Sequence, residues 1–181
     1  MTSEFDEVLK FWFEEATPQQ YFTKDVAFDN TIKARFSSLH KTAVEGKLDH
    51  WRDTPSGSLA EIIILDQFSR NIYRGHPDSF SSDGLCLQLA KKAIEKGFDK
   101  AIDIKKREFF YLPFMHSEAK EDHEKSVQLF SEKGLEIYVP FAYKHKAIID
   151  RFGRYPHRNE ILGRQSTPEE IEFLSQPGSS F

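Results

Sequence analysis

Apolar side chains recur every three or four residues along most of this 181-residue chain, which is the spacing of amphipathic helices. The runs predict helices over residues 3–13, 25–46, 58–75, 83–97, 103–122, 123–134, 143–152 and 166–174, with a short turn or helix after Pro18. There is no convincing pair of strands and no clean repeat of roughly 30 to 45 residues. The pattern therefore predicts an all-α protein of about eight helices, arranged as stacked antiparallel hairpins or as an irregular bundle. We expect one domain over residues 1–181, with a flexible tail over residues 175–181.

Local start and stop signals support these helices. Pairs with the spacing of a capping box are Ser3 with Asp6, Ser58 with Glu61, Ser166 with Glu169, and Thr167 with Glu170. Asp25 and Asp122 are further candidate N-caps. Three consecutive isoleucines, residues 62–64, suit a buried strand by composition, but the capping box before them and the apolar positions after them favour a helix. Pro113 is expected to kink or break the helix that contains it.

Composition narrows the class of protein. Aromatic residues make up 14% of the chain and seventeen residues are phenylalanine, which favours a packed core over disorder. No apolar run reaches the roughly 20 residues of a membrane span, and the first ten residues lack the features of a secretory signal. The single cysteine, Cys86, lies among apolar neighbours and is expected to be an inert core thiol. We therefore expect a cytoplasmic protein that does not act at a membrane.

Charge is distributed unevenly. The whole chain has a net charge of −4, which argues against non-specific binding of nucleic acid. Residues 144–164 nevertheless carry six basic and two acidic side chains, a local excess of +4. Lysines outnumber arginines sixteen to nine, yet six of the nine arginines lie in two short segments. Arginine is preferred over lysine where a planar, two-point contact to carboxylate or phosphate is made.

The first of these segments is LDQFSRNIYRG, residues 65–75. Its polar side chains fall one helical turn apart beside an apolar face, namely Asp66, Gln67, Arg70, Asn71 and Arg74. A solvated helix face with weak ion pairs is one interpretation. Contact of the arginines with an anionic ligand is the other.

A second polar group, His116 and Glu118, follows Pro113. A histidine beside a carboxylate can serve as a general base or a metal ligand, although a histidine bonded to backbone is the commoner arrangement. A metal site requires three or four ligands, which His145 and His157 could supply only if the fold brings them together. No spacing fixes two ligands on one helix turn, so we predict no metal and no cofactor.

The third and richest segment is residues 151–164, RFGRYPHRNEILGR. Gly153 is expected to end a helix, and Pro156 stiffens the chain that follows. The candidate ligand-binding residues here are Arg151, Arg154, His157, Arg158, Asn159 and Arg164. One interpretation is a seat for an anion beside a short helix start, and the other is a set of clips that join helices by pairing with acidic side chains. The two roles do not exclude each other.

Several stretches carry a resemblance to a known family. VLKFWF near the start, LDQFSRNIYRG, FYLPFMHSE, and above all RFGRYPHRNEILGRQSTPEEIEFL occur in the order found in a bacterial family described as domain of unknown function 924. The chain resembles this family over nearly its whole length. The resemblance implies an all-helical fold similar to tetratricopeptide-repeat proteins, and it implies no particular reaction or catalytic residue.

Two functions follow from these observations. One is a pocket for an anionic small molecule, with or without catalysis, lined by Arg70, Arg74, His116, His145, Arg154, His157 and Arg158. In this pocket, residues 151–159 hold arginines near His116 and near Arg70 or Arg74. The other is a helical interaction module that binds an acidic peptide in a groove. A closed pocket lined by these side chains would favour the first, and a long open groove would favour the second. The sequence leaves the oligomeric state open.

Overall fold

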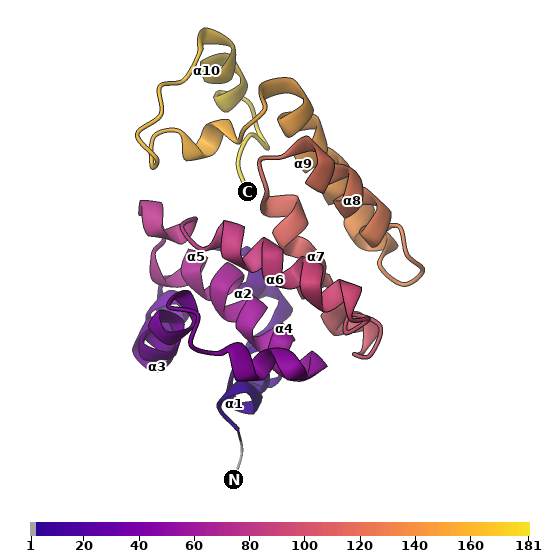
Figure 1. Ribbon diagram of the computed structural model, residues 1–181. Helices are drawn as coiled ribbons and strands as arrows, with labels where there is room; N and C mark the ends of the chain where they lie inside the picture. The colour runs from indigo at the N-terminus through magenta and orange to yellow at the C-terminus, as the bar shows by residue number, and fades with distance from the viewer. Residues whose placement is uncertain (1–2) are drawn as a thin grey trace. The chain divides into compact units, whose positions relative to one another are not determined.

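A computed structural model describes residues 3–181, and this part of the chain is helical without a strand (Figure 1). The α-helices are α1 (Glu4–Lys10), α2 (Pro18–Phe22), α3 (Val26–Val44), α4 (Pro55–Ile63), α5 (Ser69–Ile72), α6 (Asp83–Glu95), α7 (Ile104–His116), α8 (Lys120–Phe130), α9 (Val139–Phe152) and α10 (Pro168–Leu174). Short π segments, η1 (Phe11–Glu15) and η3 (Ile64–Phe68), extend α1 and join α4 to α5. The described residues therefore form nine continuous helices, close to the eight that the sequence predicts.

Two compact units divide the chain. Unit 1 takes the described residues up to Arg74 together with Asp78–Pro113, and unit 2 takes Gly75–Pro77 with Phe114–Phe181. A single domain over residues 1–181 stays a prediction.

Most predicted helix starts are confirmed. Ser3 and Asp6 form a capping box at α1, and the Asp25 side chain accepts the backbone N–H of Phe28 at the start of α3. The three isoleucines lie in helical structure, and all three are buried. The helical interpretation of this run is therefore correct.

Three predicted caps are wrong, two of them for a common reason. Helix α4 begins at Pro55 with Thr54 as its cap, and α10 begins at Pro168 with Thr167 as its cap, so neither Ser58 nor Ser166 opens a helix. Proline suits the first helical position because its φ angle is preset and its missing N–H would have no partner there. The Thr-Pro pair therefore sets both boundaries, and at α10 the predicted capping box of Thr167 with Glu170 is confirmed.

Helix α8 differs for another reason. It begins at Lys120, two residues before the predicted cap, and the Asp122 carboxylate accepts a hydrogen bond from the Ser117 hydroxyl at 2.7 Å instead. Pro113 lies inside α7 without breaking it, because α7 continues to His116.

The core of unit 1 is aromatic. Trp12 and Phe68 have ring centroids 5.7 Å apart, and Phe11 packs 5.0 Å from Phe36. Phe11 is 3% exposed, and it follows the buried Val8 by three residues, which is the spacing of one helix face. Phe11 and Trp12 of η1 therefore both face the core of unit 1.

In unit 2, α8 and α9 pack side by side (Figure 1). A smaller core of Ile148, Ile149 and Tyr155 lies beside them, with Phe152 and Phe173 packed against it. Gly153 has φ of 68° and ends α9, as predicted. The end of α9 thus directs the chain into residues 154–165, which carry the candidate site.

Candidate functional site

The polar residues of 65–75 form an internal network in unit 1. Arg70 makes a two-point pair with Asp83, at 2.9 and 3.0 Å, and a further ion pair of 2.9 Å with Asp66. Burial alone would lower the pKa of Arg70, but the two carboxylates raise it above its usual range. The Gln67 amide donates to Asp66 at 2.6 Å. Arg70 is therefore a permanent cation whose carboxylate partners belong to the chain.

Arg74 and Asn71 share one carboxylate. Arg74 donates from Nε and Nη2 to Asp29 at 2.6 and 2.8 Å, and Asn71 donates to the same carboxylate at 2.8 Å. Asp29 belongs to α3, so these bonds join α3 to the end of α5. All five polar residues predicted in this segment thus hold unit 1 together, and a ligand anion would have to compete with carboxylates already in place.

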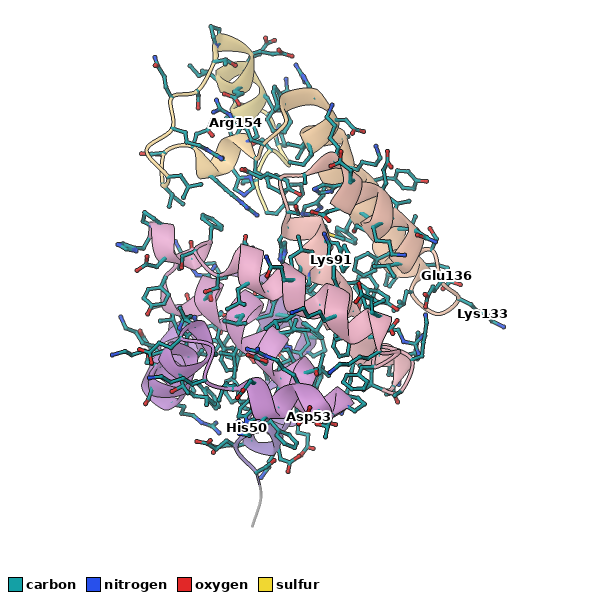
Figure 2. The ribbon with its side chains drawn as sticks, in the orientation of Figure 1. His50, Asp53, Lys91, Lys133, Glu136 and Arg154 are labelled. Carbon is teal, nitrogen blue, oxygen red and sulfur yellow. The ribbon has the colours of Figure 1, made fainter. Side chains whose placement is uncertain are left out.

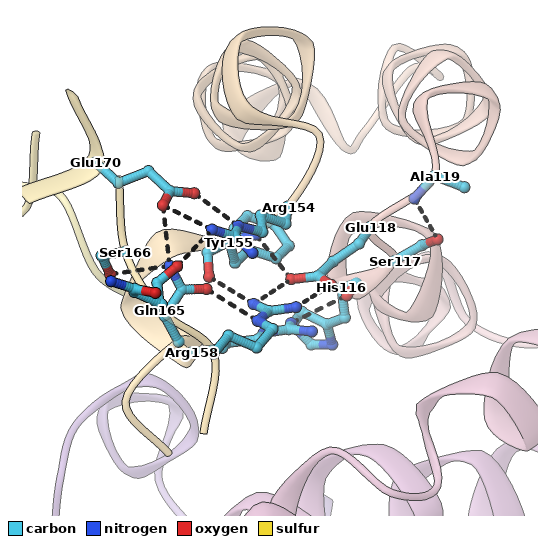
Figure 3. Close-up of polar contacts among 12 residues, drawn as sticks. His116, Ser117, Glu118, Ala119, Arg154, Tyr155, Arg158, Gln165, Ser166 and Glu170 are labelled. Atoms are coloured by element: carbon cyan, nitrogen blue, oxygen red, sulfur yellow. Dashed lines mark hydrogen bonds and ion pairs between the residues drawn. The ribbon is translucent and has the colours of Figure 1, made fainter. Parts of the chain in front are cut away.

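In unit 2, Arg164 and Glu118 form the centre of a second network. Figure 3 labels Glu118 and Tyr155, which belong to this network. Arg164 donates from Nη1 and Nη2 to the two Glu118 oxygens at 2.7 and 3.0 Å, and the backbone N–H of Tyr155 donates to Glu118 at 2.7 Å. Although burial raises the pKa of Glu118, the hydrogen bonds from Arg164 and Tyr155 leave it below its usual range. Glu118 is therefore ionised, and its oxygens already accept hydrogen bonds from Arg164 and Tyr155. This arrangement does not fit the prediction that His116 and Glu118 together act as a general base.

Arg154 and Glu170 form a parallel pair at the start of α10 (Figure 3). The two bonds measure 2.7 and 2.8 Å, and the Asn159 amide donates to the same carboxylate at 3.2 Å. The Arg154 guanidinium, with the backbone N–H of Thr167, lowers the pKa of Glu170 to about 2. Asn159 also accepts from Arg164 at 2.9 Å, so it links the two pairs.

The local excess of positive charge is smaller in the fold than along the sequence. Glu118 and Glu170 pair with Arg164 and Arg154, and Glu169 pairs with Arg151 at 2.8 Å on the surface. These three carboxylates lie outside residues 144–164, and counting them reduces the excess of that segment from +4 to +1. The clip interpretation of these arginines thus has direct structural support.

A cluster of histidines surrounds Tyr155 in the same unit. The ring centroids of His123, His145 and His157 lie 6.0, 5.9 and 5.4 Å from that of Tyr155, and we call these four residues the histidine cluster. The Tyr155 hydroxyl donates to the backbone carbonyl of Met115 at 2.5 Å. Arg158 places its guanidinium 4.6 Å from the Tyr155 ring centroid and donates to the His116 carbonyl at 3.0 Å.

Buried histidines in this cluster are held in their neutral form. A carbonyl oxygen can only accept a hydrogen bond, so His145 donates from Nδ1 to the Phe141 carbonyl, at 2.7 Å. In the neutral ring, Nε2 of His145 then carries the lone pair. Burial lowers the pKa of His145 to about 3 and also lowers that of His123. The ring of Phe181 stacks on His145 at a centroid distance of 3.8 Å. His145 thus offers a hydrogen-bond acceptor beneath an aromatic ring.

The fold separates the predicted site residues into two sets. Asp66, Gln67, Arg70, Asn71 and Arg74 belong to unit 1, and the remaining nine belong to unit 2. A site that includes both sets stays a prediction. Within residues 3–181 no group of three side chains is arranged to hold a metal ion. No helix in this part of the chain is long and apolar enough to span a membrane.

Three residues in and beside the histidine cluster were not predicted from the sequence: His123, Tyr155 and Phe181. His123 lies within a polar helix and Phe181 within the tail, so neither has a local signal. Tyr155 precedes a proline and carries only the signature of an extended residue. Their common feature is contact with side chains distant in sequence.

The residues that the structure describes are all-helical, and comparison with known proteins assigns the chain to a family. The chain belongs to the family described as bacterial protein of unknown function (DUF924), whose model matches residues 8–178. The solved structure of the protein of unknown function ATU0120 from Agrobacterium tumefaciens is 40% identical, with a TM-score of 0.89. That match covers 94% of this chain and 96% of the other. No curated protein matches this chain.

Proposed function

We propose that unit 2 binds a small molecule with a planar ring and an acidic group, beside the histidine cluster. The observation that carries this proposal is the position of the Phe181 ring. It stacks on His145 at 3.8 Å and lies 6.0 Å from the ring of His157, yet 55% of the residue remains exposed. A half-exposed ring held against polar aromatic side chains occupies the position that the ring of a ligand would take.

The chemistry around this position supports an anion. Residues 144–164, which contain His145, Tyr155 and His157 of the cluster, have an excess of one positive charge after their ion pairs are counted. The Arg158 guanidinium lies against Tyr155. The pairs of Arg151, Arg154 and Arg164 are already complete, so we assign these three residues to positioning the cluster. Arg158 and His157 are the groups that we expect to face the acidic group of the ligand.

A catalytic step is a further possibility at the same place. The lone pair on His145 Nε2 can accept a proton that a ligand shares, but a pKa of about 3 makes this ring a weak base. Binding is therefore the activity that we propose, and we assign no reaction.

Titration of the full chain with benzoate tests the proposal. Calorimetry should show saturable binding, and NMR should show shifted ring signals of His145 and His157. Phe181→Ala should bind benzoate more tightly, because the ligand no longer has to displace the Phe181 ring. Phe22→Ala, which removes a phenylalanine of similar exposure from unit 1, is the matched control.

Benzamide separates the two parts of the proposed recognition. It retains the ring and lacks the charge, so it should bind more weakly than benzoate. Absence of saturable benzoate binding, or an equal response of Phe181→Ala and Phe22→Ala, would refute the proposal.

An interaction module is the second candidate, and one observation favours it. Ile137, just before α9, and Phe141, in the first turn of α9, are 73% and 49% exposed and precede His145 by eight and four residues. A peptide with an aromatic side chain could then cover this apolar strip and replace Phe181 on His145. Binding of an acidic peptide that contains phenylalanine, lost in Phe141→Ala, would support this candidate over the first.

A further inference from the structure

Unit 1 contains a cavity that none of the predicted site residues lines. It measures about 240 Å³ and lies among η2 (Asp49–Asp53), α4 and α6. Figure 2 labels Asp53 and Lys91, which lie on η2 and α6. The cavity is lined by Arg52, Ser58, Glu61, Ile62, Leu89, Lys92, Ala93, Glu95 and Lys96.

The inner wall of the cavity is apolar and contains one hydroxyl group. Ile62, Leu89 and Ala93 are all buried. Ser58 is 6% exposed, and its hydroxyl has no hydrogen-bond partner among the described residues. Ser69, in the continuation of the same helix, instead donates to the carbonyl four residues before it, at 2.6 Å. Because the Ser58 hydroxyl leaves this common bond unmade, it is available to a ligand.

The rim of the cavity is cationic. Arg52 and Glu61 neutralise each other through bonds of 2.8 and 2.7 Å, and Glu61 is only 1% exposed. Lys92 is exposed and has no carboxylate partner among the described residues. Lys96 donates to the backbone carbonyl of Arg52 at 2.9 Å. Glu95 is the remaining acidic side chain of the lining, so two ammonium groups and one carboxylate remain once the Arg52–Glu61 pair is counted.

Size and chemistry together define the ligand class. Benzene fills a cavity of about 150 Å³ in another protein, so this cavity has room for a slightly larger molecule. The apolar wall favours a ligand with an apolar chain. The unbonded hydroxyl and the cationic rim favour a ligand group that accepts hydrogen bonds and carries negative charge. We infer that unit 1 binds a short-chain monocarboxylate, with its chain against Leu89 and Ala93 and its carboxylate near Ser58 and Lys92.

This inference is independent of the proposed function. It concerns another unit, other residues and an aliphatic ligand, and it requires no change in the histidine cluster. Ser58 does not cap α4. It lines the cavity one turn after the start of the helix.

The experiment is a titration of the full chain with hexanoate at millimolar concentrations, followed by calorimetry and NMR. Hexanoate should bind saturably, and hexanol should bind more weakly because it lacks the charge. Lys92→Glu should weaken hexanoate binding by about 10- to 100-fold, the range for loss of a charge-assisted contact. Ala93→Leu should abolish it by filling the cavity.

Controls keep each outcome decisive. Lys33→Glu makes the same charge change on α3, outside the cavity, and should leave hexanoate binding within about twofold of the wild type. Melting temperatures of every variant establish that it is folded at the temperature of the titration. Saturable binding of hexanoate that survives Ala93→Leu, equal effects of Lys92→Glu and Lys33→Glu, or no binding by folded wild type would overturn the inference.

Discussion

Arg164 and Glu118 lie 46 residues apart in the chain and meet in a two-point ion pair, with Nη1–Oε2 and Nη2–Oε1 distances of 2.7 and 3.0 Å. Glu118 also accepts the backbone N–H of Tyr155, and Arg164 donates to the backbone carbonyl of the same residue at 3.0 Å. The pair therefore holds Tyr155 from both sides of its peptide backbone. Through Tyr155 it positions the histidine cluster.

We expect Glu118→Gln to lower the free energy of unfolding by about 1–3 kcal/mol, because a guanidinium and a backbone N–H lose their charged acceptor. Urea denaturation of the full chain measures this change. Glu169→Gln is the matched control, since its pair with Arg151 is exposed, and it should alter stability by less than about 0.5 kcal/mol. Equal effects of the two substitutions would contradict the structural role of Glu118.

Arg154→Ala distinguishes a clip from an anion seat. If Arg154 joins the Gly153 turn to α10, its loss leaves the Glu170 carboxylate buried without its guanidinium, and the melting temperature should fall by several degrees. If Arg154 is such a clip, phosphate should not raise the melting temperature of the wild type by binding to Arg154. A variant that melts like the wild type but no longer responds to phosphate would identify Arg154 as part of an anion seat.

Stability should depend on pH through His145. Its pKa is about 3 in the folded chain and 6.5 in the unfolded chain, so between these values the unfolded state binds more protons. The free energy of unfolding should therefore rise as the pH increases from about 3 to 6.5 and lose this contribution on acidification. His123 and His40 have lowered pKa values and act in the same direction. His145→Gln should flatten this part of the stability profile, and an unchanged slope would contradict a buried neutral imidazole.

Cys86 should resist thiol reagents in the native protein. It is fully buried, and burial raises the pKa of its thiol well above the usual range, so little thiolate is available. Mixing with a chromogenic disulfide should give labelling only at the rate of unfolding, and complete labelling in urea. Rapid labelling of the folded chain would show that the thiol is accessible.

Gly57→Ala should destabilise unit 1 by about 1–3 kcal/mol, the usual cost of overpacking. A Cβ atom at this position would lie 2.3 Å from the backbone oxygen of Trp51, so η2 could not pack closely against α4. Thermal unfolding measures the loss. Gly84→Ala is the control, because a Cβ atom there meets nothing within 4 Å.

The sequence by itself determined the helices of this protein. The apolar spacing, the caps at Ser3 and Asp25, and Gly153 at the end of α9 are local features, and helix formation depends on contacts between residues three and four positions apart. Even the errors at Ser58 and Ser166 were decided locally, by the proline that follows a threonine. The resemblance to the family rested on the same stretches of sequence and is confirmed by the family match.

Only the tertiary structure decided what the polar residues do. An arginine carries the same charge whether it meets Glu118, Glu170 or a ligand, and the sequence contains many carboxylates that could neutralise it. Pairing over 46 residues depends on how the segments that precede α8 and α10 meet, which no local spacing encodes. For the same physical reason, the stacking of Phe181 on His145 and the unbonded hydroxyl of Ser58 became visible only in the folded chain.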